Sequence, residues 1–204
     1  MSLDSVEIGR GLRHLRRSDP VMRDVIRKAG RFTLKLRNDR FQSLVFSILA
    51  QQISSKAARA IRAKLEAHVA PEKISAEGIC RLGLDELRTV GLSKQKATYL
   101  LDLAERVSSG RLQLNRMSRL RDEAVIESLI EVKGIGVWTA QMFLIFSLGR
   151  LDVFPHADFG VRSAIKNLYG LDDLPDRETS HRIAEPWRPY ASIASWYCWR
   201  SLEF

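Results

Sequence analysis

The residues best suited to chemistry are two closely spaced glycines and one aspartate in the second half of the chain. Gly134 and Gly136 separate a helix-like run from a very apolar one, and Asp158 follows after a loop with one proline. Glycines permit a tight turn and a close approach of another backbone, and the first amides of a following helix favour a phosphate. The pattern indicates a phosphate clamp followed by a catalytic carboxylate. Taken alone, a G-x-G corner favours an ordinary turn between two helices.

Composition and charge narrow the class of partner. The chain has 204 residues, with 33 Lys and Arg against 24 Asp and Glu, a formal net charge of +9. Such a surplus indicates an anionic partner, most commonly nucleic acid, or a generally basic soluble protein. Cys80 and Cys198 are too few for a disulfide framework or a four-cysteine metal site. The most apolar stretch, residues 137–148, is too short to span a bilayer. We therefore expect a soluble, cytoplasmic protein, with a nuclear location left open.

Helical spacing runs through nearly the whole sequence and predicts an all-α fold of roughly ten short helices. Asp19 and Pro20 are typical of a helix start, and Gly30 is typical of its end. Between residues 120 and 132 the apolar positions predict one buried helix face, formed by Val125, Ile126, Leu129 and Ile130. Any cleft must then lie between helical lobes.

Four segments together resemble the helix-hairpin-helix DNA glycosylase superfamily. The first is VKGIGVWTA at residues 132–140, and after an apolar helix comes DVFPHADFGVR at residues 152–162. ILAQQIS at residues 48–54 precedes both, and WRPY at residues 187–190 with Trp196 follows. A hairpin, a loop with glycine and proline, and an aspartate thus occur in the order that defines the superfamily. Within it, the sequence is most similar to the 3-methyladenine DNA glycosylase II branch of alkylpurine glycosylases.

The resemblance implies a role for each matching position. Asp158 matches the catalytic aspartate. Gly134, Gly136 and Thr139 match residues whose backbone groups hold a DNA phosphate. That phosphate is often held through a monovalent cation, whose ligands would be the backbone carbonyls of Ile130, Val132 and Ile135. The resemblance implies no cofactor for the chemistry itself.

Aromatic side chains would form the lesion pocket. The resemblance assigns its walls to Trp138, Phe159 and Trp196. Met142 lies one helical turn after Trp138, where it either lines the pocket or fills the core. Trp199 is interpreted as a core aromatic residue, which is the ordinary role of a lone tryptophan.

Five further positions remain, and all but Asp152 have more than one interpretation. Gln52 or Ile53 matches the wedge that fills the gap left by a flipped nucleotide, although such residues usually just end a helix. Lys133 lies before the hairpin and is expected to meet phosphate or solvent. Arg162, four residues after Asp158, either reaches a phosphate or is a solvated surface arginine. Asp152, at the entrance of the loop, is expected to have a structural hydrogen-bonding role.

One position bears on the type of chemistry. In bifunctional relatives a nucleophilic lysine follows the second hairpin glycine by two residues, and here that position is Trp138. Without an amine no Schiff base with the sugar can form, so strand cleavage by that route is expected to be absent. An N-alkylated purine is cationic, which aromatic ring faces favour. A carboxylate beside the sugar stabilises the oxocarbenium-like charge as the glycosidic bond breaks.

The resemblance thus predicts a monofunctional DNA glycosylase that flips alkylated purines out of double-stranded DNA and leaves an abasic site. The expected protein is a monomer with no membrane partner. Residues 48–147 would form a central bundle ending in the hairpin, and residues 1–47 with 148–204 a second lobe, with Asp158 in the cleft between them. Two alternatives stay open: a glycosylase for another damaged base on the same scaffold, and a non-catalytic helix-hairpin-helix DNA-binding module.

Overall fold

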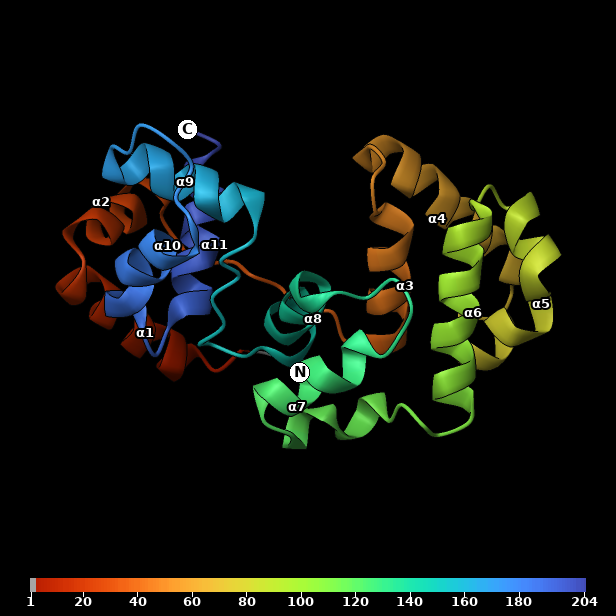
Figure 1. Ribbon diagram of the computed structural model, residues 1–204. Coiled ribbons are helices and arrows are strands. Elements are labelled where there is room, and N and C mark those ends of the chain that lie inside the picture. Colours follow the sequence, from red (N-terminus) through yellow and green to blue (C-terminus); the bar gives the residue numbers. More distant parts are fainter. Residues whose placement is uncertain (1–2) are drawn as a thin grey trace. The chain divides into compact units, whose positions relative to one another are not determined.

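The computed structural model describes residues 3–204, and in this range all regular structure is helical (Figure 1), which confirms the all-α prediction. The chain divides into two compact units, residues 37–143 and residues 1–36 with 144–204. We call these the central unit and the terminal unit. Within residues 3–204 no helix is long and apolar enough to cross a bilayer.

The central unit contains six α-helices and one 3-10 helix. In chain order these are α3 (Arg40–Ala50), α4 (Ser55–Val69), α5 (Ala76–Thr89), α6 (Lys94–Ser108), η1 (Leu114–Arg119), α7 (Asp122–Ile130) and α8 (Val137–Phe143). The helix α6 packs against both α5 and α3, and α3 also contacts α4, α8 and η1. The helix α3 therefore contacts four other elements of this unit, while α6 joins α3 to α5.

The terminal unit combines the two ends of the chain. Its helices are α1 (Ser5–Ser18), α2 (Pro20–Ala29), the π-helical turn η2 (Leu144–Leu148), α9 (Phe159–Tyr169), α10 (Arg177–Ala184), the 3-10 helix η3 (Glu185–Trp187) and α11 (Ala191–Ser201). The helix α11 contacts α1, α2 and α9. It is buried along most of its length, and this burial joins the N-terminal helices to the segment that follows the hairpin.

The first boundary between the units differs from the predicted one. The sequence interpretation assigned residues 37–47 to the second lobe, whereas α3 belongs to the central unit. The cause is the apolar face of α3, because Leu44, Val45, Ile48 and Leu49 are buried and α3 contacts only central-unit elements closely. The later boundary lies at residue 143 rather than 147.

Helix ends follow local capping chemistry. Asp19 caps α2 through its Oδ1, which accepts from the amide of Val21 at 2.8 Å, and Gly30 ends that helix with φ 76°. The Oδ2 atom of Asp19 accepts from Trp187 Nε1 at 2.8 Å and from the Tyr169 hydroxyl. This buried carboxylate therefore ties α2 to η3 and α9, and its hydrogen bonds satisfy the charge that burial would otherwise disfavour.

One predicted helix face is partly wrong. Val125 and Leu129 of α7 are fully buried, but Ile130 is 45% exposed. Ile130 is the last residue of α7, where the chain leaves the helix for the hairpin. The helical spacing therefore no longer points its side chain toward the core.

Candidate functional site

Asp158 is held at the start of α9. It is 8% exposed and is the N-cap of the helix, with Oδ1 accepting from the Val161 amide at 2.8 Å. Its own amide donates to the Pro155 carbonyl at 2.9 Å. The N-terminus of a helix favours a negative charge because its first amides lack helical partners. The backbone therefore fixes both the place and the orientation of this carboxylate.

Trp199 is the second support of Asp158, and its interpretation as a core residue was incomplete. The indole Nε1 donates to Oδ1 of Asp158 at 2.8 Å, and the ring stacks on Phe146 with centroids 5.6 Å apart. A Cβ added at Gly160 would lie 3.0 Å from the indole and 3.2 Å from Oδ1, so a side chain there would crowd this hydrogen bond. Sequence reasoning missed Trp199 because its partner lies 41 residues earlier.

The loop before Asp158 is fastened to the start of α11. Asp152 accepts from Arg188 Nε at 3.1 Å and from the Ala191 amide at 3.3 Å, which confirms its predicted structural role. Ser192 adds three bonds, since its amide donates to the Leu151 carbonyl and its hydroxyl both accepts from the Val153 amide and donates to the Val153 carbonyl. These contacts restrain the path of the chain into Asp158.

Three other predicted site residues of the terminal unit, Phe159, Trp196 and Arg162, differ in exposure and in the contacts they make. Phe159 is 72% exposed, whereas Trp196 is 9% exposed and packs edge-on against Phe32 and Tyr197. Arg162 donates through Nε to the Pro175 carbonyl at 2.9 Å. The guanidinium of Arg162 is thus held within the chain, and its phosphate contact stays a prediction.

The electrostatics of the loop favour a neutral imidazole at His156. Burial lowers the pKa of His156, and the neighbouring charges of His181, Arg177 and Arg162 lower it further. The ordinary histidine pKa lies below neutrality, so a lowered pKa leaves His156 uncharged at pH 7.

In the central unit the hairpin, which we define as residues 133–136, is tightly specified. Gly134 has φ 80°, and a Cβ added there would lie 2.0 Å from the ring of Tyr99. The Ile135 amide donates to the Val132 carbonyl at 3.0 Å, which closes the turn. At Gly136, by contrast, an added Cβ would meet no atom of the described chain within 4 Å. The fold itself therefore requires glycine at 134 but not at 136.

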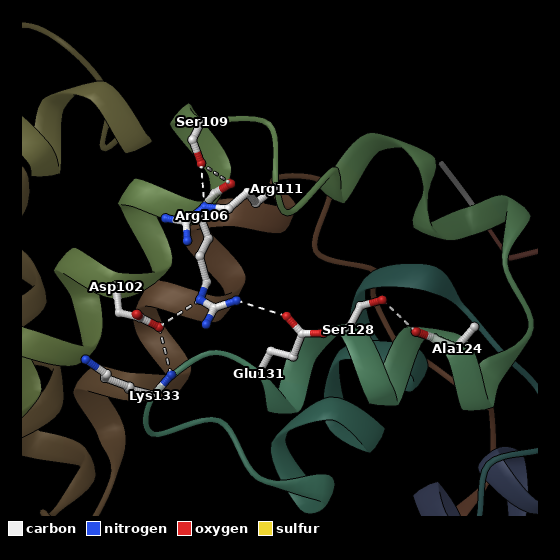
Figure 2. Close-up of polar contacts among 8 residues, drawn as sticks. All are labelled: Asp102, Arg106, Ser109, Arg111, Ala124, Ser128, Glu131 and Lys133. Carbon is white, nitrogen blue, oxygen red and sulfur yellow. Dashed lines mark hydrogen bonds and ion pairs between the residues drawn. The ribbon is translucent and has the colours of Figure 1, made fainter.

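A polar network fixes the entry to the hairpin (Figure 2). Asp102 accepts from the Lys133 amide at 2.9 Å and from Arg106 Nε at 3.1 Å, and Arg106 also reaches Glu131 at 3.0 Å. Only the backbone of Lys133 takes part in these bonds, and its side chain is exposed. The phosphate or solvent role of that side chain stays a prediction.

Residues of α8 present two different faces. Trp138 is 45% exposed in the first turn, and Met142, one turn later, is half-buried. Thr139 is 5% exposed, so only its backbone is suited to a ligand. The three carbonyls predicted for a cation, those of Ile130, Val132 and Ile135, lie between the end of α7 and the start of α8.

The predicted wedge belongs to the segment that joins α3 to α4, and we call residues 51–54 the wedge loop. Gln52 is exposed with φ 55°, a left-handed conformation that is uncommon for residues other than glycine. Ile53 is 37% exposed. The side chain of Gln51 donates to the Gly134 carbonyl at 2.8 Å, so the wedge loop and the hairpin are directly joined.

The predicted site residues thus fall into two groups. The terminal unit contributes the carboxylate and its supports, and the central unit contributes the hairpin, the wedge loop and Trp138. In residues 3–204 no three His, Cys, Asp or Glu side chains are placed to hold a metal ion. Cys80 and Cys198 are free thiols.

Comparison with known families matches residues 45–189, well over half of the chain, to the HhH-GPD superfamily of base excision DNA repair proteins. The chain belongs to this superfamily. The matched range includes the wedge loop, the hairpin and Asp158, which confirms the resemblance found from the motifs. The HhH-GPD match ends before α11, so Trp199 lies outside it.

Two solved structures share the fold over at least 94% of this chain. A structure of Schizosaccharomyces pombe 3-methyladenine DNA glycosylase (Mag1) in complex with abasic DNA has a TM-score of 0.87 at 28% identity, covering 96% of this chain and 97% of that one. A DNA-3-methyladenine glycosidase from Bacillus halodurans has a TM-score of 0.85 at 37% identity, covering 94% and 88%. The putative DNA-3-methyladenine glycosylase YfjP of Bacillus subtilis is 40% identical over 127 residues. That alignment covers 62% of this chain but only 44% of YfjP.

Proposed function

We propose that the protein is a monofunctional DNA glycosylase that hydrolyses the N-glycosidic bond of alkylated purines, of the 3-methyladenine and 7-methylguanine type, in double-stranded DNA. The observation on which this rests is the fixed carboxylate of Asp158, which helix capping and the Trp199 indole hold in the motif of the HhH-GPD superfamily. The names of the relatives support the choice of lesion, since three similar proteins are described as 3-methyladenine glycosylases or glycosidases.

The chemistry follows from the residue types. A base inside a duplex is out of reach, so the nucleotide has to be flipped into a pocket, and the wedge loop supplies the residues that fill the gap. Trp138 is 45% exposed, and an aromatic ring favours a cationic base over a neutral one. As the glycosidic bond breaks, Asp158 stabilises the positive charge on the sugar and orients the attacking water. Because Trp138 occupies the position of the lyase lysine, the DNA strand stays intact.

DNA binding is assigned to the hairpin. At Gly136 the described chain offers no reason for a glycine, and an approaching phosphate would supply one, because a backbone without a Cβ lets a ligand come close. A monovalent cation would be held by the carbonyls of Ile130, Val132 and Ile135. The Val132 carbonyl already accepts one amide, but a carbonyl has a second lone pair for such a ligand. The formal charge of +9 adds general attraction to DNA, and we propose that the protein acts as a monomer.

The test uses duplexes that each contain one lesion: 3-methyladenine, 7-methylguanine, 1,N6-ethenoadenine, uracil or 8-oxoguanine. We expect release of the methylated purines, with strand breaks only after alkali. Strand breaks without alkali would contradict the monofunctional assignment. Release of only ethenoadenine, uracil or 8-oxoguanine would mean that the enzyme acts on another damaged base. No release of any base would favour a DNA-binding module without catalytic activity.

The matched variant is Asp158→Asn. Asparagine caps helices as well as aspartate does, so α9 should stay folded while the charge is lost. We expect excision to fall below detection and DNA binding to persist. Retained excision in this variant would overturn the assignment of Asp158.

A further inference from the structure

One face of α6 contacts both DNA-binding segments of the central unit. Lys96, Tyr99, Asp102 and Arg106 follow one another at spacings of three, three and four residues, so they form a single stripe along the helix. We call these four residues the α6 stripe. Its first residue contacts the wedge loop and the other three contact the hairpin region.

At the wedge loop the α6 stripe acts through Lys96. Its Nζ donates to the Leu49 carbonyl at 2.7 Å and to the Gln51 carbonyl at 2.6 Å. Carbonyls at the end of a helix lack helical partners, and a cation there satisfies them while it opposes the negative end of the helix dipole. Lys96 is half-buried, and this burial lowers the pKa of its ammonium group. These two bonds fix the backbone immediately before Gln52.

At the hairpin the α6 stripe acts through packing and hydrogen bonds. The Tyr99 ring fills the space that a side chain at Gly134 would need, and Asp102 accepts from the Lys133 amide (Figure 2). The Gln51 side chain connects the wedge loop directly to the hairpin, because it donates to the Gly134 carbonyl at 2.8 Å. Gln51 is therefore bonded to α6 through its backbone and to the hairpin through its side chain.

The conformation of Gln52 shows why such anchoring matters. The left-handed conformation is unfavourable for a residue other than glycine, and it persists only where the surrounding structure over-determines it. Gln52 is exposed, so no burial of its own side chain holds this conformation. The carbonyl of Gln51, which Lys96 holds, lies directly before Gln52, and α4 begins at Ser55 after it.

We propose that the α6 stripe is a positioning element for base flipping, with Lys96 as the residue that positions the wedge loop relative to the hairpin. This inference rests on the proposed glycosylase function. Insertion of the wedge and the grip on the phosphate then occur as one rigid step, so that a gripped phosphate places the wedge at the neighbouring nucleotide. A misplacement of the wedge loop by about 1 Å is enough to lower the excision rate severely, even though the loop takes no part in the chemical step. Lys96 touches neither base nor sugar and acts only through the loop.

The test compares Lys96→Met with Lys94→Met. Both remove one positive charge from the first turn of α6, but Lys94 is exposed, and only Lys96 holds the loop. Wild-type protein is first shown to release 7-methylguanine, and release of no damaged base at all would contradict the proposed function itself rather than the positioning role. Single-turnover excision from a paired 7-methylguanine should then be at least tenfold slower in Lys96→Met than in Lys94→Met. The affinity of the two variants for undamaged duplex should agree within about twofold, since the loss of charge is the same.

Two readouts separate positioning from a general loss of structure. The defect of Lys96→Met should shrink when 7-methylguanine lies opposite an abasic analogue, where flipping costs less. In a double-mutant cycle with Ile53→Ala, the two changes should be clearly less than additive, because Lys96 acts through the loop that contains Ile53. An equal defect on both substrates, or full additivity, would overturn the proposal.

Two more variants protect the test against misfolding. Gln51→Ala keeps Lys96 but removes the bond to the Gly134 carbonyl, and it should show the same substrate-dependent defect. Lys96→Arg keeps a cationic donor and should recover most of the rate. Wild-type rates in both Lys96→Met and Gln51→Ala would overturn the proposal even if every variant is fully folded.

Discussion

The hydrogen bond from Trp199 to Asp158 leads to a quantitative prediction. Trp199→Phe removes the Nε1 donor at 2.8 Å but keeps an aromatic ring against Phe146. A hydrogen bond to a charged group contributes about 1.5–3 kcal/mol, and each 1.36 kcal/mol in the barrier changes a rate tenfold. The Val161 amide still holds Oδ1, so the carboxylate stays at the helix start but turns more freely. We expect single-turnover excision to slow roughly 10-fold to 100-fold.

The assay measures the excision rate constant at saturating enzyme together with the affinity for an abasic duplex. Trp199→Phe should reduce the rate constant and leave the affinity within about twofold, because the indole donates to the carboxylate and not to DNA. Phe146→Leu is the matched control, since it weakens the ring stacking and keeps the indole donor. If Trp199→Phe retains the wild-type rate, or if Phe146→Leu slows the reaction equally, the hydrogen bond does not orient Asp158.

Three further predictions concern the fold and the hairpin. Gly134→Ala should lower the free energy of unfolding by about 2–4 kcal/mol, because residue 134 has a positive φ and the Tyr99 ring lies beside it. Gly136→Ala should unfold like wild type but bind abasic duplex less tightly. Equal unfolding midpoints for the two variants would contradict this distinction. Burial raises the pKa of the Cys198 thiol, so iodoacetamide should label only Cys80 in the folded protein but both thiols in urea. Labelling is measured by mass spectrometry. Labelling of Cys198 in the folded protein as fast as that of Cys80 would refute this prediction. Burial, and then the hydrogen bond to a buried aspartate, raise the pKa of Tyr169, so the folded state keeps its proton where the unfolded chain ionises. Urea midpoints should therefore fall as pH rises above about 10, and Tyr169→Phe should reduce that slope; an unchanged slope would contradict the cause.

The helices and the hairpin could be predicted from the sequence because the responsible interactions are local. Asp19 and Pro20 start α2, and the structure has Ser93 as the N-cap of α6, with its hydroxyl oxygen accepting from the Lys96 amide. The turn at Gly134 follows from a residue type that tolerates positive φ. Caps and tight turns involve residues within a few positions of each other, so they can be recognised in the sequence without knowledge of the fold.

The supports of the site could not be predicted in the same way. The bond between Trp199 and Asp158 spans 41 residues, and that between Lys96 and Leu49 spans 47. A tryptophan on an apolar helix and a lysine near a helix start have the same local pattern whether or not they meet such a partner. The exposure of Ile130 shows the same limit, because spacing does not reveal where a helix ends relative to the core.

The double use of Asp158 ties the formation of a helix to the placement of a charge. Its Oδ1 caps α9, so once the first turn of that helix has formed, the carboxylate is already oriented before any DNA arrives. Substitutions that loosen the start of α9 would then slow base excision even where they touch no nucleotide. The stability of this helix and the rate of excision are therefore coupled through one side chain.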